Sequence, residues 1–105
     1  NGLAASFLEE GSQALEKNET EKAFLLLHKA KRLVIEALLN YPGATTQQAK
    51  SFFIAATCYE KLAAQDPASL GRAKAYYQFL YIAHANTDFG RKAARYLQKL
   101  KNKGK

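Results

Sequence analysis

Apolar residues recur at steps of three and four along most of the 105-residue chain, which is the spacing of an amphipathic α-helix. Alanine, leucine, lysine and glutamate are plentiful, whereas glycine (6) and proline (2) are scarce, and this mixture also favours helices. The pattern predicts an all-α chain of five helices. Their expected ranges are 3–17, 21–40, 45–65, 67–85 and 88–101.

The breaks between these ranges carry helix stop and start signals. Asn18-Glu19-Thr20 is a short turn in which Thr20 is a candidate N-cap. Tyr41-Pro42-Gly43 should end the second helix, because proline cannot continue the hydrogen-bond ladder and glycine accepts left-handed geometry. Asp66-Pro67 combines a capping aspartate with a proline suited to the first helical position. Asn86-Thr87-Asp88 is expected to cap the closing helix.

The length suits one compact domain, and an apolar fraction of 48% is sufficient for a buried core. We therefore expect a single domain with a helix pair over 3–41, a second pair over 44–86, a closing helix over 87–101 and a frayed tail over 102–105. The apolar runs fall short of the roughly 18–20 residues that a transmembrane helix needs. No signal peptide is visible and the chain opens without methionine, which is typical of a trimmed or mature form. The sequence thus leaves the compartment open between the cytoplasm and, if an export signal has been removed, the periplasm or the exterior.

An internal repeat runs through the predicted helices. The first, third and fifth share a phenylalanine, a small residue four positions later, and alanine or tyrosine three positions after that; the segments are Phe7-Gly11-Ala14, Phe52-Ala56-Tyr59 and Phe89-Ala93-Tyr96. The second and fourth share another pattern, in Ala23-Leu27-Ala30 and Ala73-Tyr77-Leu80. A small residue lets two helices approach closely, and a bulky residue one turn away fills the adjoining gap. The repeat predicts antiparallel helix hairpins that stack on one another.

On these residues the chain resembles the tetratricopeptide repeat family. The first repeat matches the family's spacing best, at Gly11, Ala14, Ala23, Leu27 and Ala30. The resemblance implies a short right-handed superhelix, a concave groove lined by the first helix of each pair, and a scaffold or adaptor that binds a protein or peptide. The phenylalanines are 45 and 37 residues apart, whereas the family period is 34 residues, so the groove is expected to be distorted. The alternative is a simple helical bundle in which such short motifs recur by chance.

The resemblance also implies which residues line the groove. In the second pair they are Lys50, Phe53, Thr57 and Lys61, which combine cations with an aromatic ring and could grip an acidic side chain or a C-terminal carboxylate beside an apolar one. The corresponding residues are Leu8 and Ser12 in the first pair and Gly90, Ala94 and Gln98 in the closing helix. The expected partner is an acidic protein or peptide.

Positive charge gathers at the C-terminal end of the chain. The net charge is +7, and residues 87–105 hold seven Lys or Arg and one Asp. Arg91, Arg95 and Lys99 form a stripe at i, i+4 and i+8 that Lys92 flanks. This stripe suits the solvated outer face of a closing helix. The alternatives are a site for nucleic acid or an anionic surface, and a helix that mediates self-association.

Motifs of catalysis and metal binding are absent from the sequence. There is no metal-ligand spacing, no glycine-rich phosphate loop and no Gly-x-Ser-x-Gly motif, so we expect neither an enzyme nor a cofactor. His28 and His84 are isolated on different predicted helices. Cys58 lies in an apolar helical stretch, which predicts a buried side chain. The predicted helix 67–85 is apolar almost all round, which is typical of burial on two sides, and its aromatic residues could otherwise stack on a ligand.

Overall fold

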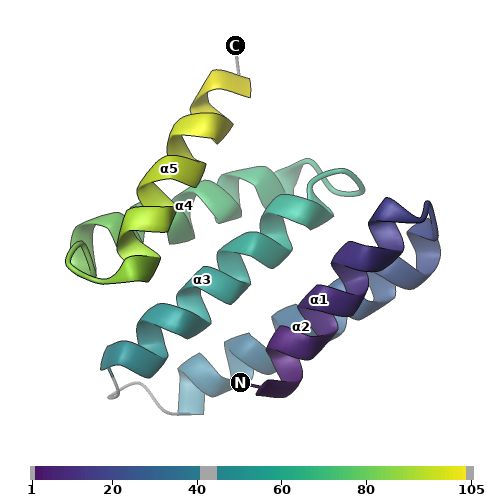
Figure 1. Cartoon of the computed structure of the whole chain (residues 1–105), viewed down its shortest axis with the longest axis horizontal. Coiled ribbons are helices and arrows are strands. Elements are labelled where there is room, and N and C mark those ends of the chain that lie inside the picture. The colour runs from purple at the N-terminus through teal and green to yellow at the C-terminus, as the bar shows by residue number, and fades with distance from the viewer. Residues whose placement is uncertain (1, 41–44, 104–105) are drawn as a thin grey trace.

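The computed structural model describes residues 2–40 and 45–103, and five helices make up nearly all of this part (Figure 1). The helices are α1 (Gly2–Glu16), α2 (Thr20–Asn40), α3 (Thr45–Leu62), α4 (Ala68–Ala83) and α5 (Asp88–Lys103). The all-α prediction is confirmed for these residues. The predicted stop at Tyr41-Pro42-Gly43 lies outside them.

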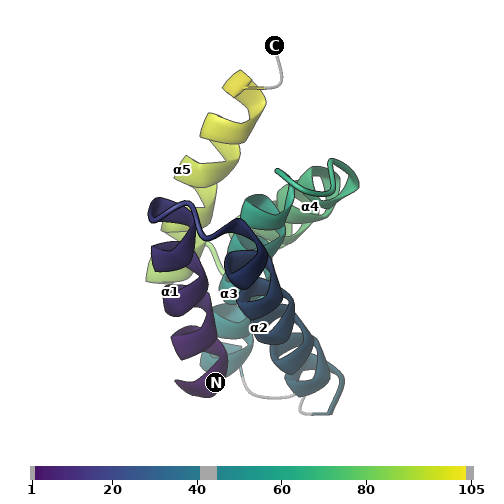
Figure 2. The same ribbon diagram turned by 90° about the vertical axis from the view of Figure 1, so that its right-hand side faces the viewer.

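Each helix packs antiparallel against the next one along the chain. The odd-numbered helices also touch one another, α1 against α3 and α3 against α5, whereas α2 and α4 do not meet over the described residues. Figures 1 and 2 accordingly show α1, α3 and α5 in a front layer with α2 and α4 behind it. The radius of gyration of 13.1 Å is that of a compact chain of about 100 residues.

Small residues set the distance between α1 and α2. A Cβ atom added at Gly11 would lie 3.0 Å from Leu27 Cγ and 3.2 Å from the Ala23 carbonyl oxygen. Both Ala23 and Leu27 are fully buried. The close approach that the repeat pattern predicted for this hairpin is therefore confirmed.

The repeat positions of α3, α4 and α5 come together in one buried cluster, which includes Ala56, Tyr59, Ala73, Tyr77, Leu80 and Ala93. The repeat phenylalanines are half-buried and pack against the buried clusters: Phe7 against the cluster formed by α1, α2 and α3, and Phe52 of α3 and Phe89 of α5 against the cluster formed by α3, α4 and α5. Bulky rings thus lie beside small side chains of neighbouring helices, as the interlocking pattern requires.

Helix boundaries differ from the predicted ones by one to three residues. α3 ends at Leu62 instead of residue 65, and α4 begins at Ala68. Asp66 caps α4, because its Oδ1 accepts the Ala68 N–H at 3.2 Å. α5 continues to Lys103, so the frayed tail expected over 102–105 is wrong for residues 102 and 103, and residues 104–105 lie outside the described part.

α4 is less buried than its composition predicted. It packs against α3 and α5, and its remaining side faces solvent. Three large side chains on it are exposed: Phe79 by 41%, Tyr81 by 52% and Ile82 by 69%. The contacts with two helices agree with the predicted burial on two sides, and the exposed side chains show that large apolar residues also lie on the side that α3 and α5 leave uncovered.

Candidate functional site

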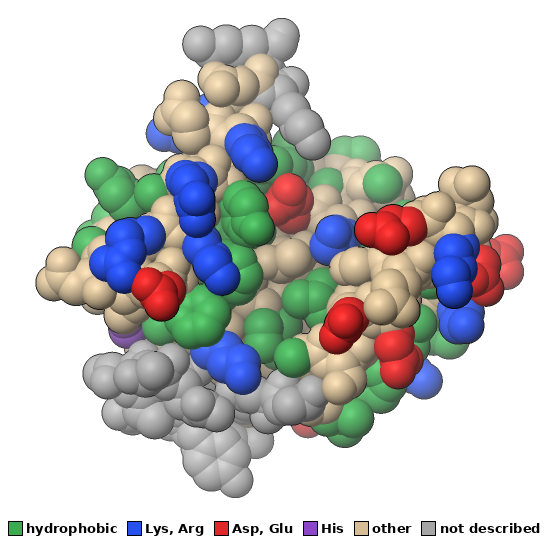
Figure 3. Space-filling model, viewed as in Figure 1, with side chains coloured by type: hydrophobic (Ala, Val, Ile, Leu, Met, Phe, Trp, Pro, Cys, Tyr) green, Lys and Arg blue, Asp and Glu red, His purple; other side chains and the backbone are tan. Residues whose placement is uncertain are grey.

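The predicted groove residues of α3 share one side of that helix. We call the surface that α1, α3 and α5 present in Figure 1 the front face. Lys50, Phe53, Thr57 and Lys61 fall at i, i+3, i+7 and i+11, and each side chain is half-buried. The two lysines are separated by about 16 Å along the helix axis. Figure 3 shows hydrophobic side chains on this face beside a row of Lys and Arg side chains along α5.

Phe53 joins α3 to the two helices that follow it. Its ring centroid lies 5.5 Å from that of Phe89 and 5.7 Å from that of Tyr96, both on α5, and 6.1 Å from that of Tyr77 on α4. These are tilted, stacked and edge-on contacts of the kind that aromatic pairs prefer. The half-buried rings of Phe53, Phe89 and Tyr96 form an aromatic floor between α3 and α5.

Thr57 holds a polar chain that runs into α4. Its Oγ1 lies 2.9 Å from the Phe53 carbonyl oxygen and 3.2 Å from the Tyr77 hydroxyl, which donates to Glu60 Oε1 at 2.7 Å. The Tyr77 proton is therefore used by Glu60, and the single Thr57 proton serves the Phe53 carbonyl and the Tyr77 oxygen. Thr57 has no proton left for a ligand, so its part in the site is to position Tyr77.

The lysines of α3 differ from Thr57 in having no internal partner. Neither Lys50 nor Lys61 makes an ion pair or hydrogen bond within the part of the chain that the structure describes. Across the aromatic floor, Lys99 places its Nζ 5.7 Å from the centroid of the Tyr96 ring, a cation–π distance. One ammonium group therefore lies over the aromatic floor, and Lys50 and Lys61 lie about one turn before and two turns after Phe53 on the same side of α3.

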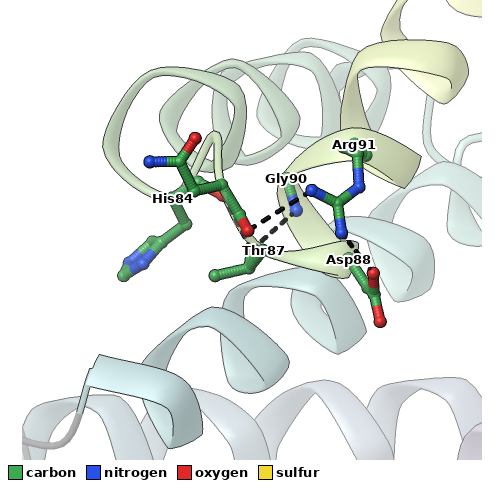
Figure 4. A network of polar contacts seen from close by, with 6 residues as sticks. His84, Thr87, Asp88, Gly90 and Arg91 are labelled. Carbon is green, nitrogen blue, oxygen red and sulfur yellow. Dashed lines mark hydrogen bonds and ion pairs between the residues drawn. The ribbon is translucent and has the colours of Figure 1, made fainter.

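The basic stripe of α5 is exposed as predicted: Arg91, Lys92, Arg95 and Lys99 all face solvent. Among contacts within the described part of the chain, Arg91 is the one of these four that polar contacts hold in place, since it pairs with Asp88 and donates to the Asn86 carbonyl at 3.3 Å (Figure 4).

The turn before α5 fixes the direction of that helix. Thr87 Oγ1 accepts the Gly90 N–H at 3.0 Å and donates to the His84 carbonyl at 2.7 Å (Figure 4). This is an N-cap, in agreement with the predicted capping turn. Gly90 lies so close to the turn that an added Cβ atom would be 2.0 Å from the His84 carbonyl oxygen.

The groove positions expected in α5 are wrong. Gly90 is buried against the α4–α5 turn, and Ala94 and Gln98 line hollows beside Tyr81 of α4. Phe89 and Tyr96 are the α5 residues that meet α3. The cause lies in the packing of α5 on α4 through Ala93, Leu97 and Leu100, which sets the rotation of the helix. The seven-residue spacing of Phe89 and Tyr96 is the sequence signal that could have found them.

The groove positions expected in α1 contribute less than those of α3. Leu8 is half-buried and packs against the cores of the first hairpin. Ser12 donates its hydroxyl proton to the Leu8 carbonyl at 2.8 Å. Neither side chain offers a charged group to a ligand.

The remaining reactive side chains serve the fold. Cys58 is fully buried as predicted, and desolvation raises the pKa of its thiol to about 12. His28 contacts Lys31 at 3.2 Å and Gln65 at 3.4 Å, and His84 contacts Gln48 at 3.3 Å.

Within residues 2–40 and 45–103, no group of three His, Cys, Asp or Glu side chains could hold a metal ion. No helix in the same residues is both long enough and apolar enough to cross a bilayer. Comparisons with protein families, curated proteins and solved structures found no match to this chain. The proposals below therefore rest on geometry and charge.

Proposed function

We propose that this chain is a protein-binding scaffold that holds an acidic peptide on its front face, between α3 and α5. The observation that carries the proposal is the aromatic floor of Phe53, Phe89 and Tyr96, with Lys99 over one of its rings and two lysines on the same side of α3 as Phe53. Lys50 and Lys61 have no internal ion partner in the described residues, and Lys99 lies over Tyr96. The proposal involves no catalytic step and no cofactor.

The occupant follows from the chemistry of this face. An apolar side chain of the peptide would rest on the aromatic floor, and carboxylates on either side of it would meet the lysines. Exposed ion pairs contribute little affinity individually, so apolar contact with the floor supplies most of the binding energy and the lysines select an acidic sequence.

The front layer of α1, α3 and α5 also supports an architecture like that of tetratricopeptide repeats. In such an arrangement the first helix of each pair lines a concave surface, and here the odd-numbered helices touch one another, whereas α2 and α4 do not over the described residues. The proposed superhelix is short and irregular, because α5 turns Phe89 and Tyr96, and not Gly90, Ala94 and Gln98, toward α3.

The test is a peptide titration with a charge-reversed protein. A fluorescent peptide with one aromatic or leucine side chain between glutamates should bind the wild-type chain, and its lysine-substituted version should not. Lys50→Glu with Lys61→Glu should weaken binding of the acidic peptide by roughly tenfold or more and leave the melting temperature nearly unchanged, since both side chains lie partly in solvent.

The matched control is Lys17→Glu with Arg32→Glu, which changes the net charge equally at two exposed positions away from the aromatic floor. An equal loss of affinity in this control would show that overall charge attracts the peptide. Unaltered binding by the Lys50/Lys61 variant would remove the groove assignment.

A second candidate function is electrostatic binding of nucleic acid or an anionic surface through Arg91, Lys92, Arg95 and Lys99. The observation in its favour is that all four side chains are exposed along one helix whose sole acidic residue is Asp88. A salt titration with a short DNA duplex separates it from peptide binding. Phosphate contacts would give a steep linear fall of log affinity with log salt, and Arg95→Glu with Lys99→Glu would reduce that slope by about 2.

Self-association is a third proposal, and sedimentation velocity of the free chain tests it. A concentration-dependent dimer would indicate that the exposed α4 and α5 surfaces bind a second copy. A monomer over the tested range would exclude it there.

A further inference from the structure

A recess lies on the side of α5 away from the aromatic floor, between that helix and the C-terminal end of α4. It consists of two adjoining hollows with volumes of about 510 and 270 Å³, which share Tyr81 and Ala94. We call this recess the outer cleft. It runs along α5 from Gly90 to Lys101, a length of about 17 Å, or three helical turns.

The residues along the middle of the outer cleft have small, apolar side chains. Ala85, Gly90 and Ala94 have little or no side chain, and the half-exposed ring of Tyr81 stands beside them. Small residues on a helix let another helix approach closely. The dimensions and the small residues therefore suit an α-helix lying alongside α5.

The cations of the outer cleft favour a helix that carries negative charge. Arg91, Lys92 and Arg95 line the larger hollow and Lys101 the smaller one. Asp88 is the acid in its lining, and its carboxylate is already paired with Arg91. Arg95 and Lys101 make no ion pair within residues 2–40 and 45–103.

We propose that the outer cleft binds an acidic amphipathic helix of another protein. Its apolar side chains would pack on Tyr81 and Ala94, and its carboxylates would face Arg95 and Lys101. The docking site uses the opposite side of α5 from the aromatic floor, so it does not depend on the peptide site of the front face. Together the two sites would let one chain hold two partners.

The test uses a synthetic helical peptide of about 14 residues, matched to the length of the cleft, with leucines on one stripe and glutamates on both flanks. A second peptide carries lysine in place of each glutamate. The acidic peptide should bind the full chain, as measured by fluorescence anisotropy, and the basic one should not. In the NMR spectrum, the amide signals that shift should be those around Tyr81, Ala94 and Gln98.

Two variants probe the cleft separately. Ala94→Trp fills it from a half-exposed position, and Arg95→Glu reverses a solvent-facing charge at its edge. Each should weaken the acidic peptide roughly tenfold. Lys17→Glu, an exposed charge reversal in the turn after α1 and outside both proposed sites, should leave its affinity unchanged. Circular dichroism checks that Ala94→Trp remains folded, and Tyr81→Ala replaces it if it does not.

Four results would overturn the proposal. One is no binding of the acidic helix, and another is equal affinity for wild type and both cleft variants. The third is a set of shifted signals around Phe53 and Tyr96, which would place the helix on the front face and support that site instead. The fourth is displacement of the peptide by a DNA duplex that binds wild type and Ala94→Trp with equal affinity. That result would assign the cations to phosphate binding and remove the helix site.

Discussion

Gly90 controls how closely α5 follows α4, and the structure gives it a matched control. Replacement by alanine would put Cβ 2.0 Å from the His84 carbonyl oxygen, so the turn would have to move, and we expect Gly90→Ala to lower the free energy of unfolding by about 2–3 kcal/mol. Gly71 has no neighbouring atom within 4 Å of such a Cβ and lies in α4, so Gly71→Ala should be neutral or stabilise by up to about 1 kcal/mol. Urea unfolding measures both, and equal effects of the two substitutions would contradict this account.

The two close-approach glycines differ in how far the sequence could predict them. Gly11 belongs to a repeat segment, and its contact with Leu27 follows from the pairing of two patterned helices. Gly90 falls at a repeat position that the family resemblance assigns to a groove, although it is buried against a carbonyl of the preceding turn. That contact depends on the path of residues 84–87, which no periodicity encodes.

At the scale of the element, the start of α5 depends on one hydroxyl. Thr87→Ala removes both the bond to the Gly90 N–H and the bond to the His84 carbonyl, and should lower the free energy of unfolding by about 1 kcal/mol. Thr87→Ser keeps the oxygen and should recover most of that loss. Urea unfolding of the three proteins decides, and a serine variant as weak as the alanine variant would show that the Thr87 methyl group matters more than the cap.

The helices and the caps at Asp66 and Thr87 were readable from the sequence, because periodic apolar positions and capping residues are local features. Thr20, the expected N-cap of α2, is instead the first residue of that helix. The exposure of one side of α4 could not be predicted from the sequence. Its apolar residues point in all directions, so the sequence could not tell which side would lie against α3 and α5. The same ambiguity hid the rotation of α5, which its contacts with α4 determine.

At the scale of the whole molecule, the α3 stripe was predictable and its surroundings were not. The spacing of Lys50, Phe53, Thr57 and Lys61 places them on one side of any helix. That Thr57 would give its proton to the fold, and that Phe53 would meet two rings of α5, depends on side chains brought from other helices. The spacing within a single helix determines which residues share a side, and the neighbouring helices determine which of those side chains are used by internal contacts.

The buried ionisable groups make the whole fold sensitive to alkali. Desolvation is the main cause that raises the pKa of the Cys58 thiol to about 12, and it also raises the pKa values of Tyr77 and Tyr76 above their usual value. All three groups are neutral when protonated, and each loses its proton at lower pH in the unfolded chain than in the folded one. Their contribution to stability is therefore complete below about pH 8.5, the pKa of an unfolded cysteine, and falls as the pH rises toward the folded values.

Melting temperatures measured at intervals from pH 8 to pH 11 should accordingly fall, with Cys58 dominating from about pH 8.5 and the tyrosines from about pH 10. Tyr77→Phe should lower the melting temperature at pH 8, because it deletes the bond to Glu60, yet should make the fall above about pH 10 shallower than in the wild type. Tyr81→Phe is the matched control, because that ring is half exposed, and it should keep the wild-type slope. Parallel curves for wild type and Tyr77→Phe would show that Tyr77 does not couple proton loss to unfolding, and would leave Cys58 and Tyr76 as the source of the fall.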